Sequence, residues 1–162
     1  MEKVSIEVRK TWQKDGLELS VVWIRDHYCG YAKFPKRPTR ERGHSGILTY
    51  VPVHGGITYS EEDGDGWKYG FDCAHCDDYV DYRIPSISPL GGHKWTEEEV
   101  IAETEKMTRG IQLATKYEVR YLRNISNKGK AKVIDQYHKE LGEKFDVRDN
   151  VGASLNLLCG KL

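Results

Sequence analysis

Histidine, aspartate and cysteine side chains gather between residues 51 and 81, each time directly after an apolar run. The first run ends in V-P-V-H-G-G-I-T-Y, and the second continues as W-K-Y-G-F-D-C-A-H-C-D-D-Y-V-D-Y. The side chains with useful chemistry are His54, Asp72, Cys73, His75, Cys76, Asp77 and Asp78. Imidazoles and carboxylates transfer protons near neutral pH and bind divalent cations. The sequence therefore predicts the functional site in this stretch.

A hydrolytic site is the first interpretation of this cluster. Four residues that we predict to be catalytic form a mixed nitrogen and oxygen set: His54, Asp72, His75 and Asp78. Such a set suits a divalent metal ion that keeps one position for water, with His54, Asp72 and His75 as the metal ligands. Asp72 and His75 are three residues apart, so they meet only if the chain turns after Phe71. The alternative is that Asp72 caps that turn and His75 is an ordinary polar residue.

Cys73 and Cys76 form a C-x-x-C motif with further interpretations. A structural zinc site normally takes four ligands from two such pairs, and the chain offers only Cys29 and Cys159 as other thiols. Thiol–disulfide exchange requires a low thiol pKa at a helix start, whereas this motif follows several predicted antiparallel strands. The third interpretation is two packed thiols, and it is the one that we favour.

Acid and base catalysis without a metal is another interpretation of the same cluster. His54 is followed by Gly55 and Gly56, which leave room for a substrate and expose N–H groups that can hold an oxyanion or a phosphate. A carboxylate such as Asp72 would orient one of the imidazoles. Gly55 and Gly56 are therefore predicted to bind the ligand, the alternative being a plain turn.

The segment Pro35–Gly46 is rich in proline, glycine and basic residues, and we predict an exposed loop. Guanidinium groups hold phosphate or carboxylate in a bidentate manner, so Arg37, Arg40 and Arg42 are predicted to bind a small anionic ligand. The alternative is a solvated loop without a ligand.

An alternating pattern of apolar and polar residues predicts antiparallel strands in the N-terminal half. Residues 3–12 and 17–25 alternate in this way, and Asp15-Gly16 supplies a tight turn between them. A further short strand is predicted at Gly30–Phe34. Ile47–Val53 and Gly66–Phe71 are predicted to pair in a second hairpin, with an acidic glycine turn between them. If Tyr59 and Trp67 flank that turn, His54 and Asp72 lie near the same end of the ladder.

Helices are predicted in the C-terminal part. Thr96 and Glu99 form a capping box, and the apolar residues that follow have helical spacing: Val100, Ile101, Thr104 and Met107. Over residues 111–122 the helical and strand patterns are both present. A last helix is predicted at Ala131–Leu141, with Gly142 as its cap.

These elements predict an α+β fold in a single domain, residues 1–162, with an antiparallel sheet in the N-terminal half, helices packed on one face and a helical C-terminal part.

The 25 basic and 25 acidic residues cancel, which argues against binding long nucleic acid through uniform charge. Apolar runs fall short of the roughly 20 residues that span a bilayer, and the N-terminus lacks a signal-peptide core. We therefore expect a cytoplasmic protein without a membrane partner. The ten tyrosines suit an interface, which leaves a homo-oligomer open.

The H-G-G-I-T-Y and G-F-D-C-A-H-x-x-D segments resemble a group of small proteins encoded by tailed bacteriophages and prophages. An upstream G-Y-A-K-F-P and a downstream W-T-E-E-E-V-I-A-E-T-E belong to the same resemblance, which covers Cys29 to Met107. It implies a viral accessory protein that acts against a host defence system in the host cytoplasm. It implies no particular mechanism, because the group has no established activity.

Two functional hypotheses follow. The first is an enzyme whose His/Asp site hydrolyses a small phosphorylated or nucleotide-like molecule, with or without a divalent metal. The second is a non-enzymatic counter-defence protein that sequesters a nucleotide signal or binds a host defence protein. The acidic residues of the cluster oppose passive capture of an anion, which favours the enzyme. A module in which these residues only organise loops is the third, structural alternative.

Overall fold

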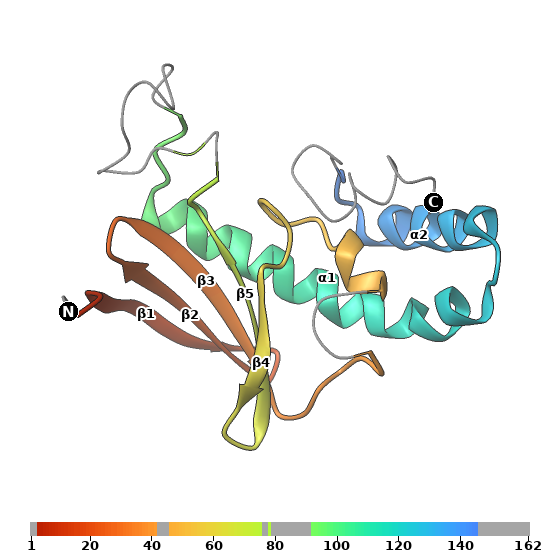
Figure 1. Ribbon diagram of the computed structural model, residues 1–162, viewed down its shortest axis with the longest axis horizontal. Helices are drawn as coiled ribbons and strands as arrows, with labels where there is room; N and C mark the ends of the chain where they lie inside the picture. Colours follow the sequence, from red (N-terminus) through yellow and green to blue (C-terminus); the bar gives the residue numbers. More distant parts are fainter. Residues whose placement is uncertain (1–2, 42–45, 76–77, 79–91, 146–162) are drawn as a thin grey trace.

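A computed structural model describes residues 3–41, 46–75, 78 and 92–145 of the chain. Within these residues the chain forms five strands followed by two α-helices, with a short 3-10 helix between the third and fourth strands (Figure 1). Their bounds are β1 Ile6–Lys14, β2 Leu17–Ile24, β3 His27–Phe34, η1 Gly46–Tyr50, β4 Tyr59–Asp63, β5 Gly66–Asp72, α1 Glu97–Arg123 and α2 Asn127–Leu141. The predicted α+β class is confirmed.

All five strands pair antiparallel, in the order β1-β2-β3-β5-β4. Asp15 and Gly16 have φ angles of 52° and 75°, which a tight hairpin turn requires, so the predicted pairing of the first two strands is confirmed. The β1–β2 register shifts between Val8 and Lys10, which marks a β-bulge at Arg9.

The predicted strand Ile47–Val53 is wrong. This segment forms η1 and then irregular chain, and its apolar side chains are buried, with Leu48 and Val51 almost inaccessible to solvent. A continuous apolar run is compatible with any fully buried segment. The pattern of residues 47–53 therefore could not distinguish a strand from a 3-10 helix followed by irregular chain. The partner of β5 is instead β4, and the turn between them contains Gly64 with a φ of 61°. His54 consequently lies in a loop and not at a strand end.

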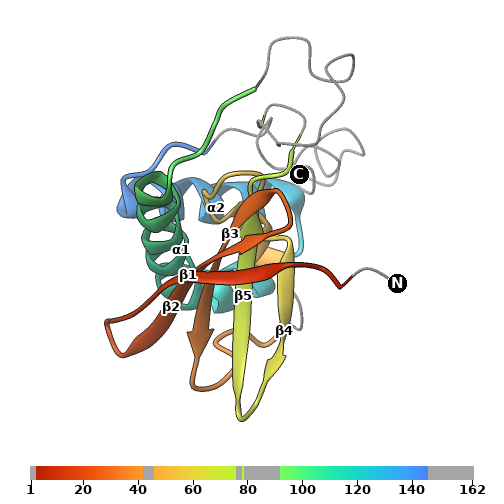
Figure 2. The same cartoon turned by 90° about the vertical axis from the view of Figure 1, so that its left-hand side faces the viewer.

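Helix α1 begins with the predicted capping box, in which the Thr96 side chain accepts the Glu99 N–H and the Glu99 side chain accepts the Thr96 N–H. It packs on β2 and β3 and covers one face of the sheet (Figure 2). The predicted contacts through Val100 and Met107 are confirmed, because both side chains are fully buried, and Ile101 packs at the margin of the core.

The helix continues through Gly110 to Arg123, which resolves the ambiguous residues 111–122 as helix. Gly110 is the point where three segments meet. A Cβ there would lie 2.7 Å from Val51, and the Gly110 carbonyl accepts a hydrogen bond of 2.7 Å from the buried Tyr137 hydroxyl of α2. A side chain at this position would push these segments apart.

Helix α2 begins at Asn127, one turn earlier than predicted, because Ser126 caps its N-terminus by accepting the Gly129 N–H. Gly142 ends it in the left-handed conformation, as predicted. Neither helix in the described ranges is long and apolar enough to cross a bilayer.

Candidate functional site

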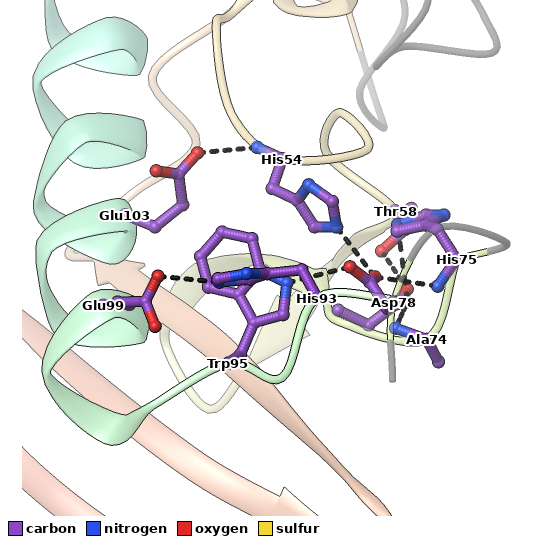
Figure 3. A network of polar contacts seen from close by, with 10 residues as sticks. His54, Thr58, Ala74, His75, Asp78, His93, Trp95, Glu99 and Glu103 are labelled. Carbon is purple, nitrogen blue, oxygen red and sulfur yellow. Dashed lines mark hydrogen bonds and ion pairs between the residues drawn. The ribbon is translucent and has the colours of Figure 1, made fainter. Parts of the chain in front are cut away.

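The site lies at one end of the sheet, next to the start of α1. β3 begins there at His27, and β5 ends there at Asp72, which lies opposite Cys29 in the ladder. The loop carrying His54 comes from the segment before β4, and Trp95 lies just before α1 (Figure 3). Four segments distant in sequence therefore contribute side chains to one cluster.

Asp78 is the centre of this cluster and is only 1% exposed. Its Oδ2 accepts hydrogen bonds from Nε2 of His54 at 2.7 Å and from the N–H of His75 at 2.9 Å. Its Oδ1 accepts the Trp95 indole N–H at 2.8 Å. Burial by itself raises the pKa of the Asp78 carboxyl, but these three hydrogen bonds outweigh burial, so the pKa lies below its usual value. Asp78 is therefore a carboxylate at neutral pH.

His54 is held through both its backbone and its ring. Its N–H donates to Oε1 of Glu103 on α1 at 2.7 Å, and its ring lies 4.7 Å from the Trp95 ring, centroid to centroid. Because Asp78 is ionised and can only accept, Nε2 of His54 is the donor nitrogen. The neutral ring then has its lone pair on Nδ1. A buried carboxylate that fixes the imidazole tautomer in this way is how a general base is oriented.

The Gly55-Gly56 turn positions His75. Both glycines have positive φ angles, 70° and 80°, and a Cβ on Gly55 would lie only 2.0 Å from Nε2 of His75. The Gly56 N–H donates to the Val53 carbonyl at 2.9 Å. The predicted ligand-binding role of Gly56 is therefore corrected, because its N–H is used inside the turn. Gly55 allows the imidazole to approach the backbone closely.

Asp72 and His75 form a second imidazole–carboxylate pair, with Nε2 of His75 3.5 Å from Oδ1 of Asp72. Asp72 also accepts the Ala74 N–H at 3.0 Å, which gives the chain the predicted turn after β5, and the Thr58 hydroxyl at 3.0 Å. The rings of His75 and His54 are 5.2 Å apart. The structure thus brings all four residues predicted to be catalytic into one cluster.

A metal centre is not formed by the predicted ligands. Among the described residues, no group of three or more His, Cys, Asp or Glu side chains could hold a metal ion. The predicted ligands are His54, Asp72 and His75. They do not converge, because Nε2 of His54 is bonded to Asp78 whereas Nε2 of His75 is shielded from solvent and lies against Gly55.

The described cysteines are packed thiols. Cys29 and Cys73 are free and buried. Burial raises the pKa of the Cys29 thiol to about 12 and raises the pKa of Cys73 as well, so neither is a thiolate at neutral pH. Cys76 and Cys159 lie outside the described residues.

The basic loop lies at the other end of the sheet. Arg37 donates to the Thr39 and Arg40 carbonyls, and its guanidinium lies 5.5 Å from the ring of Trp67. Trp67 is near the start of β5 and Asp72 ends it, which separates them by about 17 Å at the rise of a strand. The structure therefore does not bring Arg37 to this site, contrary to the prediction, and Arg40 lies in the same loop, where Glu118 of α1 accepts its backbone N–H. Arg42 lies outside the described residues.

Two residues of the site were not predicted, Glu103 and His27, and Trp95 was not assigned to it. Glu103 holds the His54 loop, and Trp95 packs between His54 and a pocket of about 170 Å³. His27 lines that pocket, and its Nδ1 lies 2.8 Å from Oδ1 of Asp26. For His27 the only local indication in the sequence was the Asp26-His27 pair between two strands, and such a pair is too common to be informative alone.

Comparison with known proteins finds no match to a protein family, a curated protein or a solved structure.

Proposed function

We propose that the protein hydrolyses a small phosphorylated or nucleotide-like molecule, with His54 as the general base and Asp78 as the residue that orients it. One observation carries the proposal: the 2.7 Å bond from Nε2 of His54 to a carboxylate that is 1% exposed. An ionised carboxylate in this position keeps the imidazole in one tautomer and stabilises the imidazolium that forms when the ring takes a proton.

The proposed step is attack of water on phosphorus. The water oxygen forms the new P–O bond while the bond to the leaving oxygen breaks. His54 takes the proton of the attacking water, the leaving oxygen takes a proton from solvent, and His54 then returns its own proton to solvent. Asp72 and His75 are positioning residues here, because they shape the turn that presents the backbone N–H of His75 to Asp78.

The biological setting in this proposal is counter-defence. It rests on the resemblance of residues 29–107 to phage and prophage accessory proteins, for which a host signalling nucleotide is a fitting target. Host cytoplasm is the corresponding location. A divalent metal remains part of the proposal only as a condition to be tested with a chelator.

The alternative function is sequestration of the nucleotide without chemistry. A specific observation favours it: the pocket next to the site is lined by Trp95 and not by His54. A ligand bound there would touch the aromatic wall and leave the imidazole on the far side of it.

One experiment separates these functions. The protein is incubated with nucleoside mono-, di- and triphosphates, with and without chelator, and is then heat-denatured so that the recovered ligand can be analysed by chromatography. Hydrolysis by the wild type, reduced at least about 100-fold in His54→Gln, supports the enzyme, because glutamine can still donate to Asp78 but cannot transfer the proton. His138→Gln is the matched control. Recovery of unchanged ligand after stoichiometric binding would instead support sequestration.

A further inference from the structure

The pocket beside Trp95 combines positive charge with aromatic rings. It is lined by two cations, three aromatic rings, an imidazole–carboxylate pair and a thiol, namely Arg9, Lys94, Trp23, Tyr28, Trp95, His27, Asp26 and Cys73. Asp26 is engaged with His27, and Arg9 lies 3.6 Å from Oε1 of Glu7 in an exposed ion pair that a ligand phosphate can replace, so Arg9 and Lys94 supply the positive charge of the pocket. Cations next to exposed aromatic faces suit a ligand that is both planar and anionic.

The β-bulge in β1 is what directs Arg9 to this pocket. Val8 lies opposite Val22 and Lys10 opposite Val21, so Arg9 is the extra residue in the ladder. Its guanidinium lies over the Trp23 ring, 5.7 Å from the centroid. Bulges change the direction of a side chain relative to its neighbours, and this one places a positive group at an aromatic wall.

The aromatic walls are fixed by contacts outside the pocket. Trp23 meets Tyr28 edge to face, with centroids 4.7 Å apart. The Trp95 indole is fixed by its hydrogen bond to Asp78. The rings are therefore held in place before any ligand arrives, which lowers the entropic cost of binding.

His27 supplies a polar contact in the same pocket. Its Nδ1 lies 2.8 Å from Oδ1 of Asp26, which orients the ring so that Nε2 is the nitrogen that a ligand can contact.

We propose that this pocket binds the base and phosphate of a nucleoside monophosphate unit, with the base against Trp23 and Trp95 and the phosphate on Arg9 and Lys94. The inference rests on the ligand class of the proposed function, and because His54 does not line the pocket it accords with the sequestration alternative. At about 170 Å³ the pocket is smaller than a typical ligand pocket of about 300–1,000 Å³, so it takes part of such a unit and leaves the rest in solvent. A second pocket of about 360 Å³ suits an anion less, because it is lined by Asp72, tyrosines and no Lys or Arg.

The test is calorimetric titration with adenosine 5′-monophosphate, adenosine and inorganic phosphate as separate probes. The monophosphate binds more tightly than either part, and Arg9→Gln raises its Kd at least about tenfold, as expected for loss of a charge-assisted hydrogen bond. Arg37→Gln is the matched control, because Arg37 also lies over a tryptophan, Trp67, at a similar distance of 5.5 Å. It changes the Kd less than about twofold.

Two outcomes overturn the assignment: no binding of the monophosphate to the wild type, or equal effects of the two arginine variants in proteins with unchanged thermal unfolding. Trp95→Leu provides a second variant of the same pocket and weakens adenosine as well as the monophosphate. The outcomes separate this inference from the proposed function. Binding without turnover in the wild type contradicts hydrolysis and leaves the pocket assigned, whereas turnover together with a monophosphate Kd that Arg9→Gln does not change contradicts the pocket and leaves hydrolysis standing.

Discussion

Helix α1 holds two loops by the same contact. Glu103 accepts the backbone N–H of His54 at 2.7 Å, and Glu118 accepts the backbone N–H of Arg40 at 2.9 and 3.1 Å. The two glutamates are 15 residues apart, about 22 Å along the helix. Both loops carry side chains that suit an anionic ligand, and both are fixed to the same rigid element.

The loops differ in what their side chains meet. The ring of His54 bonds to a buried carboxylate and packs against the wall of a pocket. Arg37, in the other loop, donates to carbonyls of its own loop. A residue of suitable chemistry therefore becomes a candidate for function only when the fold gives it a partner that sets its protonation or aims it at a cavity.

The largest expected effect comes from removing the charge at the centre of the His54 cluster. Asp78→Asn replaces one carboxylate oxygen by an NH2 group, which cannot accept a hydrogen bond, and makes the other oxygen a weaker, neutral acceptor. We expect the loss of these acceptors to lower the free energy of unfolding by about 2–4 kcal/mol. Chemical denaturation measures this loss. Asp72→Asn is the control, and its partly exposed carboxylate costs less than about 1 kcal/mol. Equal losses would show that Asp78 is not the centre of the network.

The Gly55 turn gives the next largest effect. Alanine at Gly55 adds a contact with His75 to the strain of a positive φ, whereas alanine at Gly16, with a φ of 75°, has nothing within 4 Å of its Cβ. We expect Gly55→Ala to cost about 1–3 kcal/mol more than Gly16→Ala in urea unfolding. The difference isolates the contact from the strain. If the two variants lose the same stability, His75 does not depend on the close approach.

The two glutamates of α1 that hold the loops, Glu103 and Glu118, test the difference between the loops directly. Glu103→Ala and Glu118→Ala each leave a backbone N–H without its carboxylate and cost about 1–2 kcal/mol. Only Glu103→Ala is expected to reduce turnover or ligand binding, because only its loop carries a ring of the site. Thermal unfolding and ligand assays on both proteins check this. A loss of activity in Glu118→Ala at unchanged stability would end the distinction between the loops.

The sequence predicted the fold well where the information is local. The Asp15-Gly16 turn and the Thr96 capping box depend on neighbouring residues, and both are confirmed. The four residues predicted to be catalytic do lie in one cluster, and their types alone had singled them out. The strand at Ile47–Val53 was wrong, because burial on all sides is set by tertiary packing. Arg37 does not lie at the site, because tertiary packing also decides which end of the sheet its loop reaches. His27 was missed for the same reason.

The smallest effect concerns a histidine outside the site. Burial lowers the pKa of His138, whose Nε2 bonds to the Tyr50 carbonyl at 2.7 Å. The unfolded chain then binds the proton more readily, so this residue's contribution to stability is full above pH 6.5 and is lost as the pH falls toward the folded pKa. The loss is at most about 1.4 kcal/mol per pH unit. His138→Gln flattens the wild-type slope between pH 6.5 and 5 in urea unfolding. An unchanged slope contradicts the assignment.

The junction at Gly110 has a consequence for hydrogen exchange. Val51 packs against this glycine and Tyr137 bonds to its carbonyl, so the middle of α1 cannot open without releasing both the segment before His54 and helix α2. Amide protons there should exchange only through global unfolding, at the slow limit for the molecule. The N–H of His54, held by one carboxylate at the helix surface, is free to exchange through a local opening that leaves the helix intact. The loop that carries the proposed base can thus open without unfolding the helix that holds it.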